Sequence, residues 1–194
     1  VHGDVVATDR ATLDLAQPDA VAAVMREVRP DLVVNAGAYT AVDQAESEPE
    51  LARAINADGP AALGAACAAA GIPIVHLSTD YVFDGAKTSP YVETDPTAPQ
   101  SVYGATKFGG EMGVAASGAK HVILRVSWVH APEGKNFVRT MLRLASSRER
   151  LGVVADQIGR PTYAPHLAIA LRDIAARLVL DPDAPTGVFH LTGS

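Results

Sequence analysis

Four side chains in this sequence have the types and spacing of a proton-donating site. Thr79 and Asp80 stand in "STDYVFDG", directly after the strand-like run "IPIVHLS". Tyr103 and Lys107 follow in "VYGATK"; four residues apart on a helix, they lie on one face, one turn apart. A free tyrosine has a pKa of about 10, which a neighbouring ammonium lowers. Because a general acid works best with a pKa near the operating pH, the pair predicts a tyrosine proton donor.

The elements expected to position these side chains alternate along the chain. Near-continuous apolar runs predict buried strands at 4–8, 31–36, 72–78, 121–127, 151–154 and 187–191. Helical patterns between them predict helices at 18–28, 49–70, 102–116, 136–147 and 163–180. This alternation indicates an α/β fold with a doubly wound, Rossmann-like parallel sheet. In such sheets ligands bind outside the carboxyl ends of the strands, where Thr79 can offer its hydroxyl to the same carbonyl oxygen as Tyr103.

Composition excludes several other classes of function. The chain has 194 residues, of which 48% are hydrophobic and 20% charged, enough for one domain with a sizeable core. Its net charge is −6 and no Lys/Arg run stands out, which disfavours nucleic acid or a membrane surface as partner. The six histidines are scattered without ligand spacing, so no metal site is expected. Cys67 stands alone, is expected to be a buried small hydrophobe, and fits a cytoplasmic location.

Longer strings of the sequence resemble a known family. They are "RPDLVVNAGAYTAVDQAESEPELARAIN", "VHLSTDYVFDG", "VYGATKFGGE", "RVSWVH", "NFVRTMLRLA" and "DQIGRPTYA". Together they resemble the extended short-chain dehydrogenase/reductase family and, within it, the dTDP-4-dehydrorhamnose reductases. The resemblance implies reduction of the C4 ketone of dTDP-4-dehydro-L-rhamnose to dTDP-L-rhamnose, with NADPH or NADH as cofactor. It implies a dTDP-sugar substrate, no nucleic-acid or membrane partner, and is compatible with a homodimer.

The same resemblance assigns roles to individual residues. Tyr103 matches the catalytic acid, Lys107 the lysine that lowers the tyrosine pKa and holds the nicotinamide ribose, and Thr79 the hydroxyl that orients the ketone. Thr79, Asp80 and Trp128 match substrate contacts. A tryptophan at a strand end offers a large flat surface, although plain core packing is the alternative for Trp128.

Cofactor contacts are also implied by the resemblance. They fall at Asp14, Leu15, Ala38, Tyr39, Thr40, Tyr103 and Lys107. Small residues near position 38 would let a dinucleotide approach the backbone, with tight packing as the alternative. At the end of the first expected strand, Asp9 could bind the ribose 2′-hydroxyl of NAD and Arg10 the 2′-phosphate of NADP, so the choice between them stays open.

One part of the family pattern is absent from the sequence. The family carries a glycine-rich loop after its first strand, where a helix N-terminus meets the pyrophosphate, and no such loop precedes Asp9. The chain is therefore expected to be a fragment. Residues 1–154 are predicted to form a dinucleotide-binding domain without its first strand and glycine-rich loop, and residues 155–194 part of the substrate-binding region.

Two other functions remain alternatives. The non-catalytic regulatory β subunit of methionine adenosyltransferase shares much of "AYTAVDQAESEP" and "DYVFDG". Another nucleotide-sugar 4-ketoreductase or epimerase of the same superfamily is the second. Trp128 and "DQIGRPTYA" favour the reductase, and Thr79, where serine is commoner, favours the rhamnose branch.

Overall fold

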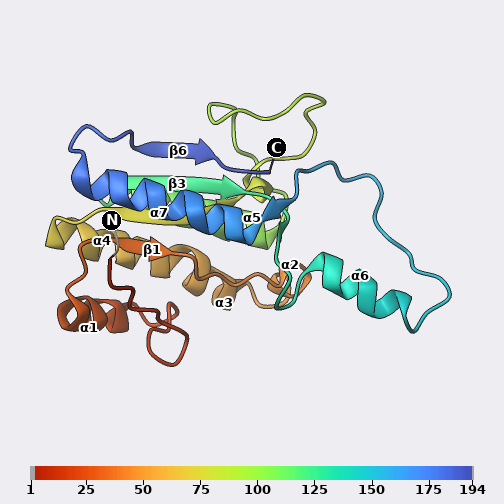
Figure 1. Cartoon of the computed structure of the whole chain (residues 1–194), viewed down its shortest axis with the longest axis horizontal. Coiled ribbons are helices and arrows are strands. Elements are labelled where there is room, and N and C mark those ends of the chain that lie inside the picture. Colours follow the sequence, from red (N-terminus) through yellow and green to blue (C-terminus); the bar gives the residue numbers. More distant parts are fainter. Residues whose placement is uncertain (1–2, 194) are drawn as a thin grey trace.

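Four parallel strands form the central sheet of the computed structural model, which describes residues 3–193 (Figure 1). Their order is β1-β2-β3-β6, so the chain adds strands in one direction across the sheet. The strands are β1 (Val33–Asn35), β2 (Ile74–Thr79), β3 (His121–Val126) and β6 (Gly187–His190). Parallel pairing sets the carboxyl ends of β2 and β3 side by side, with Thr79 opposite Val126. Thr79 therefore lies at the edge where ligands bind in this class of sheet.

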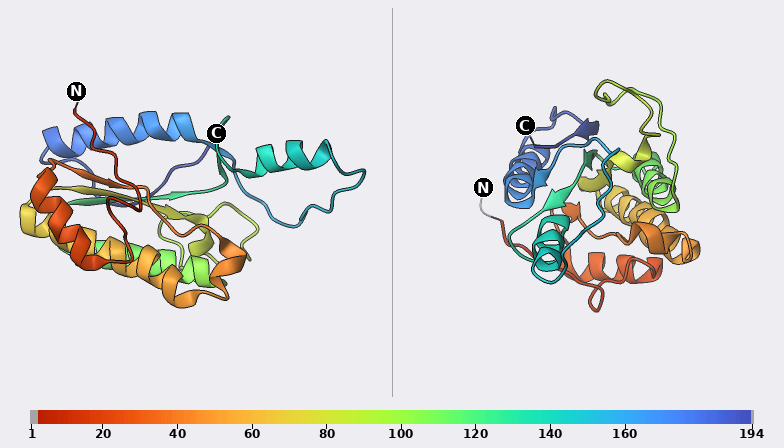
Figure 2. Two further views of the ribbon diagram at one scale, coloured as in Figure 1. Left: turned by 90° about the horizontal axis from the view of Figure 1, so that it is seen from below. Right: turned by 90° about the vertical axis from the view of Figure 1, so that its right-hand side faces the viewer.

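Helices cover both faces of the sheet (Figure 2). One face carries α1 (Pro18–Val28), α4 (Gly59–Ala70) and α5 (Val102–Ala116), and the other carries α7 (Ala164–Leu180). The doubly wound α/β class is thereby confirmed. The remaining elements are α2 (Val42–Ala45), α3 (Pro49–Arg53), the π-helix η1 (Ala54–Asp58), the 3-10 turn η2 (Asp80–Val82), α6 (Phe137–Ala145) and the small parallel pair β4 (Val129–His130) and β5 (Thr162–Tyr163).

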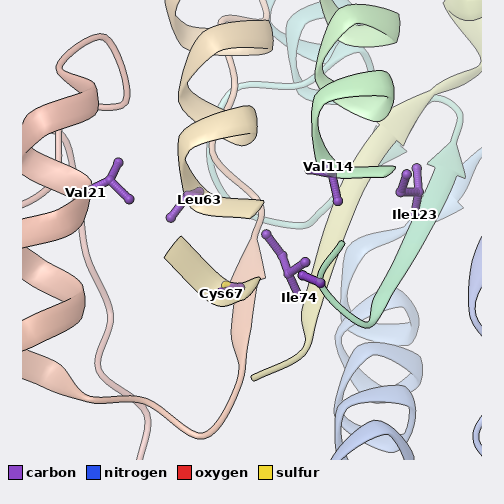
Figure 3. Packing of buried hydrophobic residues seen from close by; sticks show 7 residues of the cluster. Val21, Leu63, Cys67, Ile74, Val114 and Ile123 are labelled. Carbon is purple, nitrogen blue, oxygen red and sulfur yellow. The ribbon is translucent and has the colours of Figure 1, made fainter. Parts of the chain in front are cut away.

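Alternate residues of β2 belong to two separate apolar clusters. Ile74 packs with α1, α4 and α5, whereas its neighbour Val75 packs with Leu178 of α7. Figure 3 shows the first cluster, in which Cys67 is fully buried beside Leu63. Its complete burial in this apolar cluster confirms the expected role as a small hydrophobe, and the same burial raises the pKa of the Cys67 thiol to about 11.

Two expected strands are absent from the structure. Residues 4–8 and 151–154 have no strand structure, and their valines are open to solvent: Val5 is 88% exposed and Val154 66% exposed. Both predictions were wrong because an apolar, β-branched run becomes a strand only when a neighbouring strand pairs with it. Here neither run pairs with a strand of the sheet, whose order is β1-β2-β3-β6.

The helix expected at 49–70 forms, but in three consecutive parts, α3, η1 and α4. Pro60 has no N–H and cannot bond the carbonyl oxygen of Asn56, so the helix widens at that point. Gly110 of α5 lies against the same oxygen, and a Cβ there would be 2.2 Å from it.

The boundary expected at residue 154 remains a prediction. Beyond it, α7 covers one face of the sheet and β6 pairs with β3. Among residues 3–193, no helix is long and apolar enough to cross a membrane.

The contact at Gly110 yields a test of this packing. Gly110→Ala should lower the free energy of unfolding by about 2 kcal/mol or more, because the added Cβ clashes with the backbone of η1. This loss should appear although alanine favours a helix by about 1 kcal/mol over glycine. Gly152→Ala is the control, since nothing lies within 4 Å of its Cβ position. Equal stability of the two variants in urea unfolding would contradict the packing.

Candidate active site

Thr79 and Asp80 join the end of β2 to the turn η2. The Thr79 hydroxyl accepts a hydrogen bond from the Tyr81 N–H at 3.3 Å and donates to Asp80 Oδ1 at 3.1 Å. Burial raises the pKa of the Asp80 carboxyl, and the bond from Thr79 partly offsets that rise. The two side chains are thus fixed at the sheet edge by their own backbone turn.

Tyr103 is the second residue of α5, in the first turn of the helix, whose N-cap is Ser101. Gly104 lets this turn approach η2, because a Cβ there would be 2.3 Å from the Tyr81 carbonyl oxygen. The Tyr81 and Tyr103 rings meet edge to face with centroids 5.6 Å apart. Burial raises the pKa of the Tyr103 phenol, while the neighbouring Thr79 hydroxyl lowers it. Thr79 and Tyr103 are therefore brought together, as the sequence predicts.

Lys107 is buried one turn further along α5, with only 2% of its surface exposed. Its Nζ donates to the Leu77 carbonyl oxygen at 2.6 Å. Burial lowers the pKa of Lys107 to about 8, against an opposing effect of Glu111. In this structure burial is the largest influence on the Tyr103 pKa, so the expected lowering of that pKa by Lys107 stays a prediction for the ligand-bound protein.

Four of the residues implied as cofactor contacts lie near the carboxyl end of β1, namely Leu15, Ala38, Tyr39 and Thr40. Leu15 lies against Gly37, whose Cβ position is 3.0 Å from Leu15 Cδ1. The Asn56 side chain bonds both backbone groups of Tyr39, at 2.8 and 3.0 Å, and so fixes the segment that includes Ala38 and the exposed Thr40. The Tyr39 hydroxyl donates to Glu48 at 2.6 Å.

Asp9 and Arg10 are exposed and already engaged within the chain. Asp9 Oδ1 accepts from the N–H groups of Ala11 and Thr12, which lowers the pKa of the Asp9 carboxyl. Arg10 pairs with Asp14 at 3.6 Å. Their proposed contacts with a ribose or a phosphate therefore compete with local turn contacts.

The buried Lys107 ammonium has donors to spare for a dinucleotide. An ammonium has three N–H donors, and buried Lys107 uses one of them on Leu77 within residues 3–193. A ligand with ribose hydroxyls would satisfy the remaining donors. Over the same residues, no group of three His, Cys, Asp or Glu side chains could hold a metal ion.

Trp128 follows β3, the neighbour of β2, in a left-handed backbone conformation with φ of 45°. The residue is 43% exposed, so plain core packing does not account for it. Gly159 allows the segment "DQIGRPTYA" to lie against the ring, since a Cβ there would be 2.7 Å from Trp128 Cε2. The Ser127 hydroxyl bonds the Arg160 carbonyl oxygen and ties the two segments together.

Sequence reasoning missed a buried polar cluster beneath the site, formed by Ser78, Glu111 and Arg125. A signal was present, because Glu111 follows Lys107 by four residues and extends the helix face that carries Tyr103.

Comparison with models of known protein families shows which family the chain belongs to. The model described as "RmlD substrate binding domain" matches residues 1–194. The chain belongs to this family. A dTDP-4-dehydrorhamnose reductase of Sinorhizobium fredii is 50% identical over 192 residues, 98% of this chain and 65% of that protein. One from Escherichia coli K12 is 48% identical over 191 residues, 98% of this chain and 63% of that protein.

Solved structures agree with the family. A dTDP-4-dehydrorhamnose reductase of Bacillus anthracis in complex with NADP matches with a TM-score of 0.89 and 38% identity, over 96% of this chain and 65% of that one. The Clostridium acetobutylicum orthologue matches with a TM-score of 0.91 and 40% identity, over 98% of this chain and 66% of that one. The chain thus spans just under two thirds of the length of these relatives.

The buried charge at Lys107 yields a test with a definite sign. The lysine has its ordinary pKa of 10.5 when unfolded and about 8 when folded, a difference worth about 3 kcal/mol against folding at pH 7. Between pH 8 and 10.5 Lys107 keeps its proton in the unfolded chain but has lost it in the folded protein. The parent therefore gains stability as pH rises from about 8 to 10.5. Lys107→Met should therefore be more stable than the parent at pH 7, by about 1–3 kcal/mol.

Urea unfolding across this pH range measures the effect, and the excess stability of the variant should shrink toward pH 10.5. Lys135→Met, at an exposed position, is the matched control and should show no such trend. A Lys107→Met variant that is less stable than the parent by the same amount at every pH would contradict a buried ammonium.

Proposed function

We propose that the protein reduces the C4 ketone of dTDP-4-dehydro-L-rhamnose to dTDP-L-rhamnose with NADPH or NADH. The observation that carries the proposal is the arrangement of Thr79, Tyr103 and Lys107 around the carboxyl end of β2. The names of the relatives that are 46–50% identical to the chain support it.

Tyr103 is the proposed proton donor. The bound nicotinamide would supply a hydride to C4, which converts the carbonyl into an alkoxide. The Tyr103 hydroxyl gives its proton to that oxygen and becomes a phenolate. Burial raises the pKa of Tyr103 and keeps the phenol protonated before the reaction, and the Lys107 ammonium stabilises the phenolate afterwards.

Other residues hold the reactants. The Thr79 hydroxyl orients the ketone oxygen, and Asp80 and Trp128 contact the sugar nucleotide. The cofactor would be held by Asp9, Arg10, Asp14, Leu15, Ala38, Tyr39, Thr40, Tyr103 and Lys107. The proposal includes a cytoplasmic location, which fits the free thiol of Cys67, and a homodimer as the assembly.

The clearest test removes the proton and keeps the ring. Tyr103→Phe should lower kcat about 10²–10⁴-fold, the usual contribution of a general acid. NADPH and NADH oxidation is followed with dTDP-4-dehydro-L-rhamnose, using the product of the complete reading frame. Tyr91→Phe, which removes a hydroxyl that bonds Asp84 in the 84–101 loop, is the control and should keep the parent rate.

Absence of turnover in a folded parent that binds NADPH or NADH would contradict the proposal. It would favour a different nucleotide sugar or the non-catalytic regulatory function. Full activity of Tyr103→Phe would leave the reaction standing and refute the role of this tyrosine.

A further inference from the structure

A buried ion pair ties α5 to two strands of the sheet at once. Arg125 Nε and Nη2 donate to Glu111 Oε1 and Oε2 at 2.9 and 2.7 Å, and the two side chains are 5% and 3% exposed. The Ser78 hydroxyl also donates to Oε1, at 2.5 Å. Because Ser78 and Arg125 are register partners in β2 and β3, one carboxylate is held at one level of the sheet by both strands.

Lys107 lies one turn before Glu111 on the same helix. Its Nζ bonds the carbonyl oxygen of Leu77, and Glu111 bonds the side chain of Ser78. Helix α5 is therefore attached to β2 at two consecutive residues, directly before Thr79. The positions of Tyr103 and Lys107 relative to Thr79 follow from these two attachments.

Electrostatics link the same groups. Burial disfavours the Lys107 ammonium, and the Glu111 carboxylate favours it. His76 faces Lys107 from β2, but burial holds its pKa well below 6.5, so the imidazole is neutral at pH 7. The titratable and charged groups that act on Lys107 and Tyr103 are His76 on β2, Asp80 and Tyr81 on η2, and Glu111 on α5. Arg125 on β3 pairs with Glu111, and Asp43 on α2 acts on Tyr81.

Stability alone is a weak explanation for this ion pair. Taking two charges out of water is costly, and apolar replacements of a buried pair often fold as well or better. Arg125 also leaves its Nη1 without a hydrogen-bond partner within residues 3–193, with its guanidinium 5.0 Å from the Phe83 ring centroid.

We propose that the Glu111–Arg125 pair keeps the Lys107 ammonium charged and in place, so that Glu111 is a positioning residue of the reduction. Arg125 fixes the carboxylate, and the carboxylate compensates the burial of the ammonium. The catalytic part of this statement rests on the proposed function, whereas the effect of Glu111 on Lys107 does not.

The first experiment needs no activity. The free energy of unfolding in urea is measured from pH 6 to 10.5 for a protein with Lys107 and for its Lys107→Met variant. The difference between the two isolates the pH window in which the proton of Lys107 affects stability. In a Glu111→Gln background the lower edge of this window, set by the folded-state pKa of Lys107, should move by about one pH unit to lower pH because the compensating anion is gone, whereas the upper edge near 10.5 should stay. Ser78→Ala is the control, since it removes a hydrogen bond to the same carboxylate and keeps both charges; its window should not move.

Glu111→Gln leaves Arg125 buried without its partner and could unfold the protein. The double variant Glu111→Gln/Arg125→Met leaves neither member of the ion pair buried without its partner and should fold, with a smaller shift in the same direction. An unchanged window in the double variant, or an equal shift in Ser78→Ala, would overturn the proposal.

The second experiment is the pH profile of kcat with NADPH and the dTDP-sugar. In the double variant the loss of activity at alkaline pH should begin at lower pH than in the parent, by the same shift as in unfolding. A merely structural role would lower kcat equally at every pH. If the parent has no reductase activity, the unfolding titration still decides whether Glu111 stabilises the charged form of Lys107. Failure of the proposed function and failure of this inference are therefore distinguishable.

Discussion

The candidate active site depends on the attachment of α5 to β2 through buried polar groups. Apolar contacts of α5 with α4 bring the helix close, and Gly104 and Gly110 remove the side chains that would hold it away from η2 and η1. Hydrogen bonds then fix its register: Lys107 bonds Leu77, and Glu111 bonds Ser78. The consequence is that Tyr103 and Thr79 meet at the carboxyl end of a strand, where parallel sheets bind ligands.

This arrangement places charges where they reduce stability. An ammonium with 2% exposure and an ion pair with 3–5% exposure are both costly to bury. A neutral, fully buried His76 beside them keeps further positive charge away from Lys107. Such groups are common at functional sites, because burial that disfavours a charge also strengthens its effect on a neighbouring proton donor.

Much of this architecture could be predicted from the sequence. Apolar runs identified β1, β2, β3 and β6, and the spacing of Tyr103 and Lys107 identified one face of α5. The strands predicted at 4–8 and 151–154 do not form, because pairing between strands is a property of the whole fold and not of a segment. The spacing of Glu111 from Lys107 indicated its helix face, but not its partners. The exposure of Trp128 and the pairing of Glu111 with Ser78 and Arg125 could not be derived, since each depends on contacts between segments far apart in the chain.

One measurement tests the central claim, hydride transfer to C4 of the nucleotide sugar, most directly. The product of the complete reading frame is incubated with dTDP-4-dehydro-L-rhamnose and NADPH that carries deuterium at C4 of the nicotinamide, in the 4R and 4S forms separately. The account predicts that one of the two forms transfers deuterium to C4 of the 6-deoxyhexose, as seen by NMR of the isolated product. Cofactor oxidation without deuterium at that carbon, or deuterium at another carbon, would contradict it.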